Sequence, residues 1–242
     1  MTSATRTSIG FIGPSGGKSP HYEPFKRLIP REIDLDIRDL GVMRNQSLES
    51  LGGNRDQIVA RAVELSVSAG WAGVLVPGAP VEIQNPGLFE ALGASVHIPF
   101  STALSACADA LRAVGASRVL FLTPFNEHLN GLIRDHMGAA GFEASMADLG
   151  IGTYTDASKI GPDEVLAAAK QSLDAAGGAQ AVYFQGAILD PLPVLARMER
   201  ELGTRVMASN PTMLWSITSK LGLSYSIEGY GSLLEDWPKL IS

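Results

Sequence analysis

Four side chains that can exchange protons lie close to the ends of predicted strands. They are His21, Glu82, His128 and Asp190, and each follows a short apolar run and a turn. Imidazole and carboxyl groups placed in a cleft act as general acids and bases. We therefore take these four residues as candidate catalytic groups for proton transfer at a small substrate.

A glycine-rich segment, Gly13-Pro14-Ser15-Gly16-Gly17-Lys18-Ser19, resembles a nucleotide-binding P-loop in composition. The P-loop pattern requires a glycine five residues before its Gly-Lys pair, and that position here is Ile12. The segment instead favours close approach of its backbone to a small anion. Lys18 is the basic residue nearest in sequence to this loop, and we expect it to help hold a carboxylate.

The other histidines and the single cysteine point to packing rather than to a metal site. No histidine pair has the HExxH spacing, and the eight residues from His128 to His136 are too many for one ion on a helix. Cys107 lies among apolar residues of a predicted helix, and His97 lies in a predicted strand, so we expect both in the core. Trp215 is expected there too. The sequence predicts neither a metal site nor a cofactor.

The composition limits the partners. The 242 residues carry a formal net charge of −6, and their 19 Lys and Arg residues form no block, which argues against a nucleic-acid partner. The longest uncharged run, between Glu64 and Glu82, holds about 17 residues and contains two prolines, too short and broken for a membrane span. A single cysteine fits a reducing compartment. We expect a soluble cytoplasmic protein without a membrane partner, and a homo-oligomer stays open.

Short apolar runs alternate with helical stretches along the chain. This βαβα order predicts an α/β fold with parallel sheets flanked by helices. The predicted helices begin near Asn54, Ser101, Glu127, Pro162 and Pro211. The predicted strands are 8–12, 33–37, 74–76, 96–98, 118–122, 144–149, 181–184 and 204–208.

The same order of elements occurs twice. Strand 8–12 corresponds to strand 118–122, and Gly78 corresponds to Gly186, at offsets of about 110 residues. We expect two pseudo-symmetric lobes, 1–114 with the tail 223–242 and 115–222, with a cleft between them. Ligands of parallel sheets bind beyond the carboxyl ends of the strands. The site should therefore be built from loops 13–22, 78–82, 123–128 and 185–190, with 209–211 nearby.

Several segments carry a resemblance to a known family. They are residues 9–15, 115–119 and 199–206, and the Ser209-Asn210-Pro211 run followed by Trp215. In their order and spacing the chain resembles the aspartate/glutamate racemase superfamily, in its arylmalonate decarboxylase and maleate cis-trans isomerase branch. The resemblance covers almost the whole chain. It implies two α/β lobes around a cleft, a small carboxylate substrate and no cofactor.

The chain departs from that family at the positions that matter for chemistry. Family enzymes use a cysteine after the third strand of one or both lobes as acid and base, and the matching positions here are Gly78 and Gly186. Ala79 and Pro80 stand where Thr and Ser are usual, and Phe125 stands where a Tyr hydroxyl would help an oxyanion. The resemblance therefore implies the family's cleft with cysteine-free chemistry.

We expect a cofactor-independent lyase or isomerase, decarboxylase-like, that acts on a small carboxylate. Two alternatives stay open: a hydrolase of a small amide, ester or lactone that uses Glu or His and water, and a non-catalytic carboxylate-binding protein. The candidate substrate-binding residues are loop residues at the cleft: Pro14, Ser15, Gly16, Gly17, Lys18, Tyr22, Gly78, Ala79, Pro80, Phe125, Asn126, Gly186 and Ala187.

Overall fold

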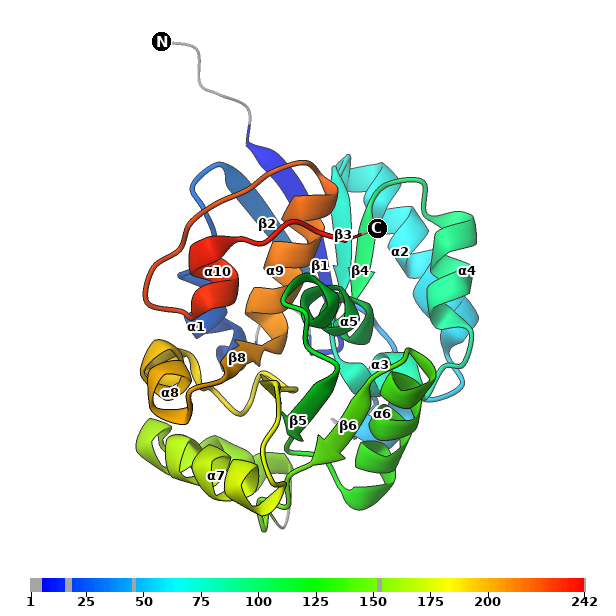
Figure 1. The fold of residues 1–242 in the computed structure, drawn as a ribbon. Helices are drawn as coiled ribbons and strands as arrows, with labels where there is room; N and C mark the ends of the chain where they lie inside the picture. The colour runs from blue at the N-terminus through cyan, green and yellow to red at the C-terminus, as the bar shows by residue number, and fades with distance from the viewer. Residues whose placement is uncertain (1–5, 16–18, 45–46, 152–153, 242) are drawn as a thin grey trace.

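Two four-stranded parallel sheets form the framework of the protein (Figure 1). The computed structural model describes residues 6–15, 19–44, 47–151 and 154–241. The strand orders are β2-β1-β3-β4 and β6-β5-β7-β8, so the second sheet repeats the first. The strands are β1 (Thr7–Gly13), β2 (Ile33–Asp39), β3 (Gly73–Val76), β4 (Phe100–Thr102), β5 (Arg118–Leu122), β6 (Glu143–Met146), β7 (Ala181–Phe184) and β8 (Arg205–Ala208). The predicted α/β fold with two similar halves is confirmed.

Helices connect the strands and cover the faces of both sheets. The α-helices are α1 (Glu23–Lys26), α2 (Arg55–Ala69), α3 (Ala79–Ile83), α4 (Leu88–Ser95), α5 (Ala103–Ala113), α6 (Glu127–Ala139), α7 (Pro162–Ala175), α8 (Leu195–Leu202), α9 (Ser209–Lys220) and α10 (Ser232–Asp236). Within the described ranges, short 3₁₀ helices add to them: η2 (Pro20–Tyr22), η3 (Leu48–Leu51), η4 (Tyr154–Lys159) and η5 (Leu192–Val194).

The two sheets share one core, which is centred on α5 and α9. These two helices pack against each other, and α9 also contacts β3, β4 and β8. Trp215 of α9 and Cys107 of α5 are fully buried in this core, as the sequence predicted. Along β3 the side chains alternate: Leu75 joins the shared core, while Val74 and Val76 face a second cluster with α2 and α4. Burial on both faces explains why the strands are continuous apolar runs.

One predicted strand is misplaced. Residues 96–98 form no strand; the fourth strand is β4, where Phe100 pairs with Val74 of β3. Val96 instead ends α4, and its N–H donates to the carbonyl of Leu92. Val96, which looks like a strand residue in the sequence, therefore ends the helix. His97 consequently lies exposed in the connection rather than in the core, which corrects that expectation.

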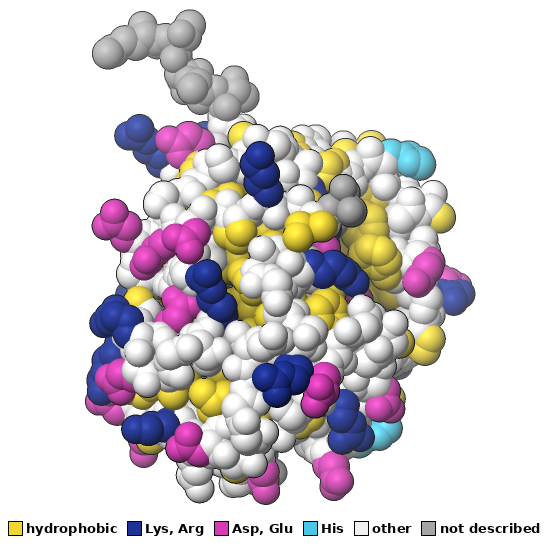
Figure 2. All heavy atoms as spheres, viewed as in Figure 1, with side chains coloured by type: hydrophobic (Ala, Val, Ile, Leu, Met, Phe, Trp, Pro, Cys, Tyr) yellow, Lys and Arg dark blue, Asp and Glu magenta, His cyan; other side chains and the backbone are white. Residues whose placement is uncertain are grey.

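Acidic and basic side chains are interspersed over the face seen in Figure 2. Every helix in the described ranges is too short or too polar to cross a lipid bilayer. Within those ranges no group of three or more His, Cys, Asp or Glu residues is placed to hold a metal ion.

Candidate functional site

A cavity of about 680 Å³ lies where the carboxyl ends of strands from both sheets meet. Gly78 follows β3 and Gly186 follows β7, and both line this cavity. The duplicated loops that the sequence singled out therefore come together at one place. The lining residues are Pro14, Ser15, Ser19, Pro20, His21, Tyr22, Asp39, Met43, Leu48, Leu51, Pro77, Gly78, Pro80, Phe125, Ser158, Gln185, Gly186, Ala187, Ile188, Ser209 and Asn210.

The backbone at both glycines disfavours any side chain. Gly78 has φ +97° and Gly186 has φ +115°, a region that L-residues rarely adopt. A Cβ on Gly186 would lie 2.9 Å from Cδ of Pro124, and one on Gly78 would lie 3.3 Å from Cγ2 of Val81. A cysteine at position 186 would therefore need both a strained backbone and a shifted proline ring. The cavity is built around glycine at both positions.

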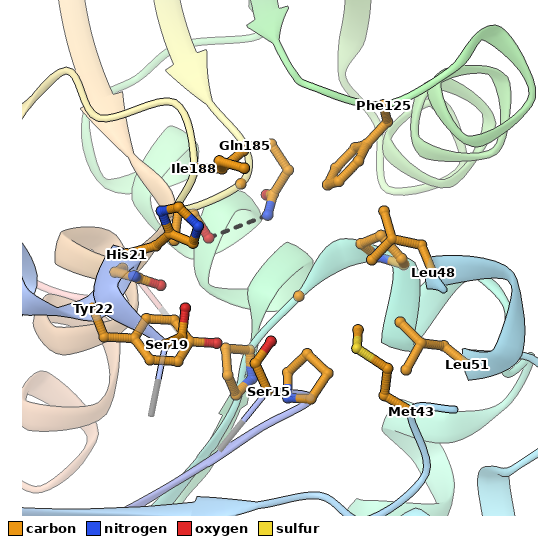
Figure 3. Close-up of a pocket in the computed structure, with 18 of the residues that line it drawn as sticks. Ser15, Ser19, His21, Tyr22, Met43, Leu48, Leu51, Phe125, Gln185 and Ile188 are labelled. Atoms are coloured by element: carbon orange, nitrogen blue, oxygen red, sulfur yellow. Dashed lines mark hydrogen bonds between the residues drawn. The ribbon is translucent and has the colours of Figure 1, made fainter. Parts of the chain in front are cut away.

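His21 is the histidine that the structure places in the cavity. It sits in η2, directly after β1 and its loop, and its ring points into the cavity near Tyr22 and Gln185 (Figure 3). Among the described residues the ring has no hydrogen-bond partner, which leaves it available to a ligand. Asp39 also lines the cavity; its Oδ1 accepts a hydrogen bond from the Gly41 N–H at 2.8 Å. His21 therefore has the position that a general acid or base needs.

Glu82 lies in the core rather than at the cavity rim. Its side chain is 6% exposed, and its carboxylate accepts a hydrogen bond from the Leu104 N–H at 3.0 Å. Burial raises the pKa of Glu82, while the nearby His136 lowers it. Nε2 of His136 lies 3.8 Å from Oε1 of Glu82, so the pair links α3 to α6. The helical turn after Gly78 carries this carboxyl inward, which the sequence did not reveal.

The other two catalytic candidates also lie outside the cavity. His128 is exposed on α6. Asp190 lines a small adjoining hollow, where its Oδ1 accepts a hydrogen bond from the Leu192 N–H at 3.1 Å. Burial raises the pKa of Asp190. Its hydrogen bond fixes the turn that leads into η5.

Some of the substrate-binding candidates line the cavity and others do not. Ala79 is fully buried and Asn126 is exposed, and neither lines the cavity. Asn126 caps α6 instead, because its Oδ1 accepts a hydrogen bond from the Leu129 N–H at 3.0 Å. Gly16, Gly17 and Lys18 lie outside the described residues. The structure gathers the rest in the cavity: Pro14, Ser15, Tyr22, Gly78, Pro80, Phe125, Gly186 and Ala187.

An apolar wall of the cavity was missed in the sequence. Met43, Leu48 and Leu51 form it, opposite His21 and Tyr22 (Figure 3). They belong to the segment after β2, which in a parallel sheet ends at the same edge as β1 and β3. The position of this segment after β2 could have identified it from the sequence. Ser158, which follows β6, could have been identified in the same way. A ligand with an apolar substituent fits this wall.

A pair of polar residues lines another part of the cavity. Gln185, at the end of β7, is fully buried, and its Nε2 donates a hydrogen bond to Oγ of Ser209 at 3.1 Å. Ser209 begins α9 directly after β8, so both residues stand at carboxyl ends of neighbouring strands. Both lie in loops that the sequence assigned to the site, although neither was chosen as a candidate.

Backbone amides of the two glycine loops complete the lining. The N–H groups of Gly78, Gly186 and Ala187 have no acceptor among the described residues. Unpaired amides that converge on a cavity bind carboxylate oxygens. The described lining contains no Lys or Arg, so these amides are its main anion-binding groups.

The comparisons with known proteins agree with this architecture. A family model described as arylmalonate decarboxylase matches residues 12–234. A maleate isomerase of Nocardia farcinica is 31% identical over 145 residues, which cover 60% of this chain and 57% of the isomerase. The crystal structure of an arylmalonate decarboxylase gives a TM-score of 0.78 at 22% identity, covering 94% of this chain and 98% of that chain.

A second solved structure carries a covalent ligand. It is a Nocardia farcinica maleate cis-trans isomerase with a covalently bound succinylcysteine intermediate. Its TM-score is 0.72 at 21% identity, and the match covers 96% of this chain and 99% of that chain. At this identity the likeness shows a shared fold. The alignment with the curated maleate isomerase spans little more than half of that protein's length.

Proposed function

The chain belongs to the arylmalonate decarboxylase family, and on that basis we propose that it is a cofactor-independent enzyme acting on small carboxylates without a catalytic cysteine. Within that class we propose a decarboxylase-like lyase, with His21 as the acid and base. The observation that carries this proposal is the convergence of Gly78, Gly186 and His21 on one cavity.

The cavity supplies the groups that decarboxylation requires. The carbon–carbon bond to the departing carboxylate breaks, CO₂ leaves, and its electron pair stays on the α-carbon. A carbonyl or carboxyl group retained on that carbon takes up the charge as an enolate. The amides of Gly78, Gly186 and Ala187, which have no acceptor among the described residues, would stabilise this oxyanion. A protonated His21 ring then delivers the proton to the α-carbon.

The apolar wall defines the rest of the substrate. Met43, Leu48 and Leu51 would cover a hydrocarbon substituent on the α-carbon, with Phe125 at its edge. Burial of such a group contributes about 25 cal/mol per Å² of apolar surface. We therefore propose α-substituted malonate-like acids as the substrate class.

The test is turnover of a panel of acids by the wild-type protein and two matched histidine variants. Phenylmalonate, methylmalonate and maleate are incubated with the protein, and their products are followed by NMR. We expect decarboxylation of a substituted malonate, a loss of 100-fold or more in His21→Gln, and no change in His128→Gln. Binding of these acids without any turnover would instead identify a binding protein. Equal activity in both variants would remove His21 from the mechanism.

A further inference from the structure

Gln185 holds an acceptor atom without a partner directly beneath the cavity. Its side chain is fully buried, and its Oε1 has no hydrogen-bond partner in the described part of the chain. Its Nε2 donates a hydrogen bond to Oγ of Ser209 at 3.1 Å, which leaves Oε1 on the other side of the amide. Figure 3 shows this side chain directed from the end of β7 toward the cavity interior, between His21 and Phe125. Buried acceptors in native proteins are almost always paired, so an unpaired one beside a cavity needs a donor from water or from a ligand.

No described side chain donates to Oε1 of Gln185, so we take its donor to come from the ligand. A carboxylate group carries only acceptors and would be repelled by Oε1 of Gln185. An N–H group on the ligand would be attracted to the same atom. The second polar group of the ligand is therefore different in kind from the carboxylate that the glycine amides attract.

Ser209 completes the recognition of that group. Its Oγ accepts a hydrogen bond from Gln185 Nε2, and its own proton can be donated to a ligand or to the neighbouring Tyr183 hydroxyl. An acceptor on Gln185 and a donor on Ser209 thus lie side by side. A carboxamide presents the complementary arrangement, with its N–H toward Gln185 and its carbonyl oxygen toward Ser209.

We propose that Gln185 and Ser209 form a subsite that binds a carboxamide. The preferred ligand is then a small acid that carries one carboxylate and one carboxamide. This inference rests on the proposed function, because it places the ligand in the same cavity.

The test uses three inert ligands of nearly equal size: succinamate, monomethyl succinate and succinate. The ester keeps the carbonyl of the amide but lacks its N–H group. Affinities are measured by calorimetry on the wild-type protein, on Gln185→Met and on Gln185→Glu. Circular dichroism and thermal melting of each variant show that it is folded.

We expect the wild-type protein to bind succinamate at least tenfold more tightly than either other ligand. Gln185→Met should reduce succinamate binding to the level of the ester and leave the ester unchanged. Gln185→Glu keeps an acceptor at this place, so it should retain the preference for succinamate over the ester even if Gln185→Met fails to fold.

Equal wild-type affinities for succinamate and its ester would overturn the carboxamide subsite while leaving the carboxylate site intact. A preference for succinamate that persists in Gln185→Met would also overturn it. Failure of all three ligands to bind at millimolar concentration would overturn the proposed function together with this inference.

Discussion

Gly78 and Gly186 each lie two residues beyond the end of a corresponding strand, β3 and β7, and both face the same cavity with positive φ. Their pairing follows from the repeated strand order of the two sheets. At each glycine the space that a Cβ would need is already restricted. The chemistry of this cavity therefore depends on residues contributed by other loops, among them His21, whose ring points into the cavity (Figure 3).

Adding a side chain should destabilise the protein more at Gly186 than at Gly78. Gly186→Ala would combine positive φ with a 2.9 Å approach to the rigid ring of Pro124. Gly78→Ala would meet Cγ2 of Val81 at the longer distance of 3.3 Å, which a shift of a few tenths of an ångström would relieve. We expect each substitution to lower the free energy of unfolding by about 1–3 kcal/mol, with the larger loss at position 186. Urea unfolding of both variants measures this, and a larger loss at position 78 would contradict it.

Cys107 should be dispensable for activity. Its side chain is fully buried in α5, and burial raises the pKa of its thiol well above the usual value, so the reactive thiolate does not form near neutral pH. Cys107→Ala should retain turnover and lower the free energy of unfolding by about 1 kcal/mol through lost packing. Native protein should also resist iodoacetamide. Loss of activity in a folded Cys107→Ala protein would show that thiol chemistry operates after all.

Glu82 predicts a specific dependence of stability on pH. Burial raises its pKa in the folded protein, so the stability contributed by its proton is present below the unfolded pKa of about 4.3 and is lost as the pH rises through the folded pKa. Glu82→Gln has no such proton to lose. We expect the variant to gain stability relative to the wild-type protein as the pH rises above about 4.3, and then to level off.

Urea unfolding at a series of pH values measures this difference. His136, whose charge lowers the Glu82 pKa, remains in both proteins. Glu143→Gln, at an exposed position of β6, serves as the control and should show a flat difference. A flat difference for Glu82→Gln as well would contradict the assignment of a strained buried carboxyl.

The apolar wall predicts selectivity by size. Met43→Ala should weaken the binding of a phenyl-substituted malonate by about 1–2 kcal/mol, because it removes apolar contact with the substituent. Unsubstituted malonate should bind equally well to both proteins. Competition binding with the two acids measures this. An equal loss for both acids would show that Met43 shapes the cavity as a whole.

Most of the fold was predictable because the apolar runs have the length and spacing of buried strands. The strand predicted at 96–98 was wrong, because a β-branched pattern cannot reveal that Val96 is already used to end α4. His97 was then placed incorrectly with it. Which carbonyl an N–H group meets depends on the geometry of the preceding helix, and local residue type carries little of that information.

The site was predictable at the level of loops but not of side chains. Ligands of parallel sheets bind beyond the carboxyl ends of the strands, and this rule correctly identified the loops around Gly78 and Gly186. The same rule does not show that α3 points Glu82 into the core or that the Asn126 side chain caps α6. The apolar wall formed by Met43, Leu48 and Leu51 escaped notice because apolar loop residues look like ordinary packing until the cavity beside them is seen.

The central claim is that His21, rather than a cysteine, faces the reacting carbon. A crystal structure of the protein with a slowly reacting α-substituted malonate tests it most directly. We predict the carboxylate on the amides of the Gly78 and Gly186 loops, with a ring nitrogen of His21 about 3–3.5 Å from the α-carbon. A ligand bound in this cavity with another titratable side chain at the α-carbon, or a ligand bound elsewhere, would contradict the account.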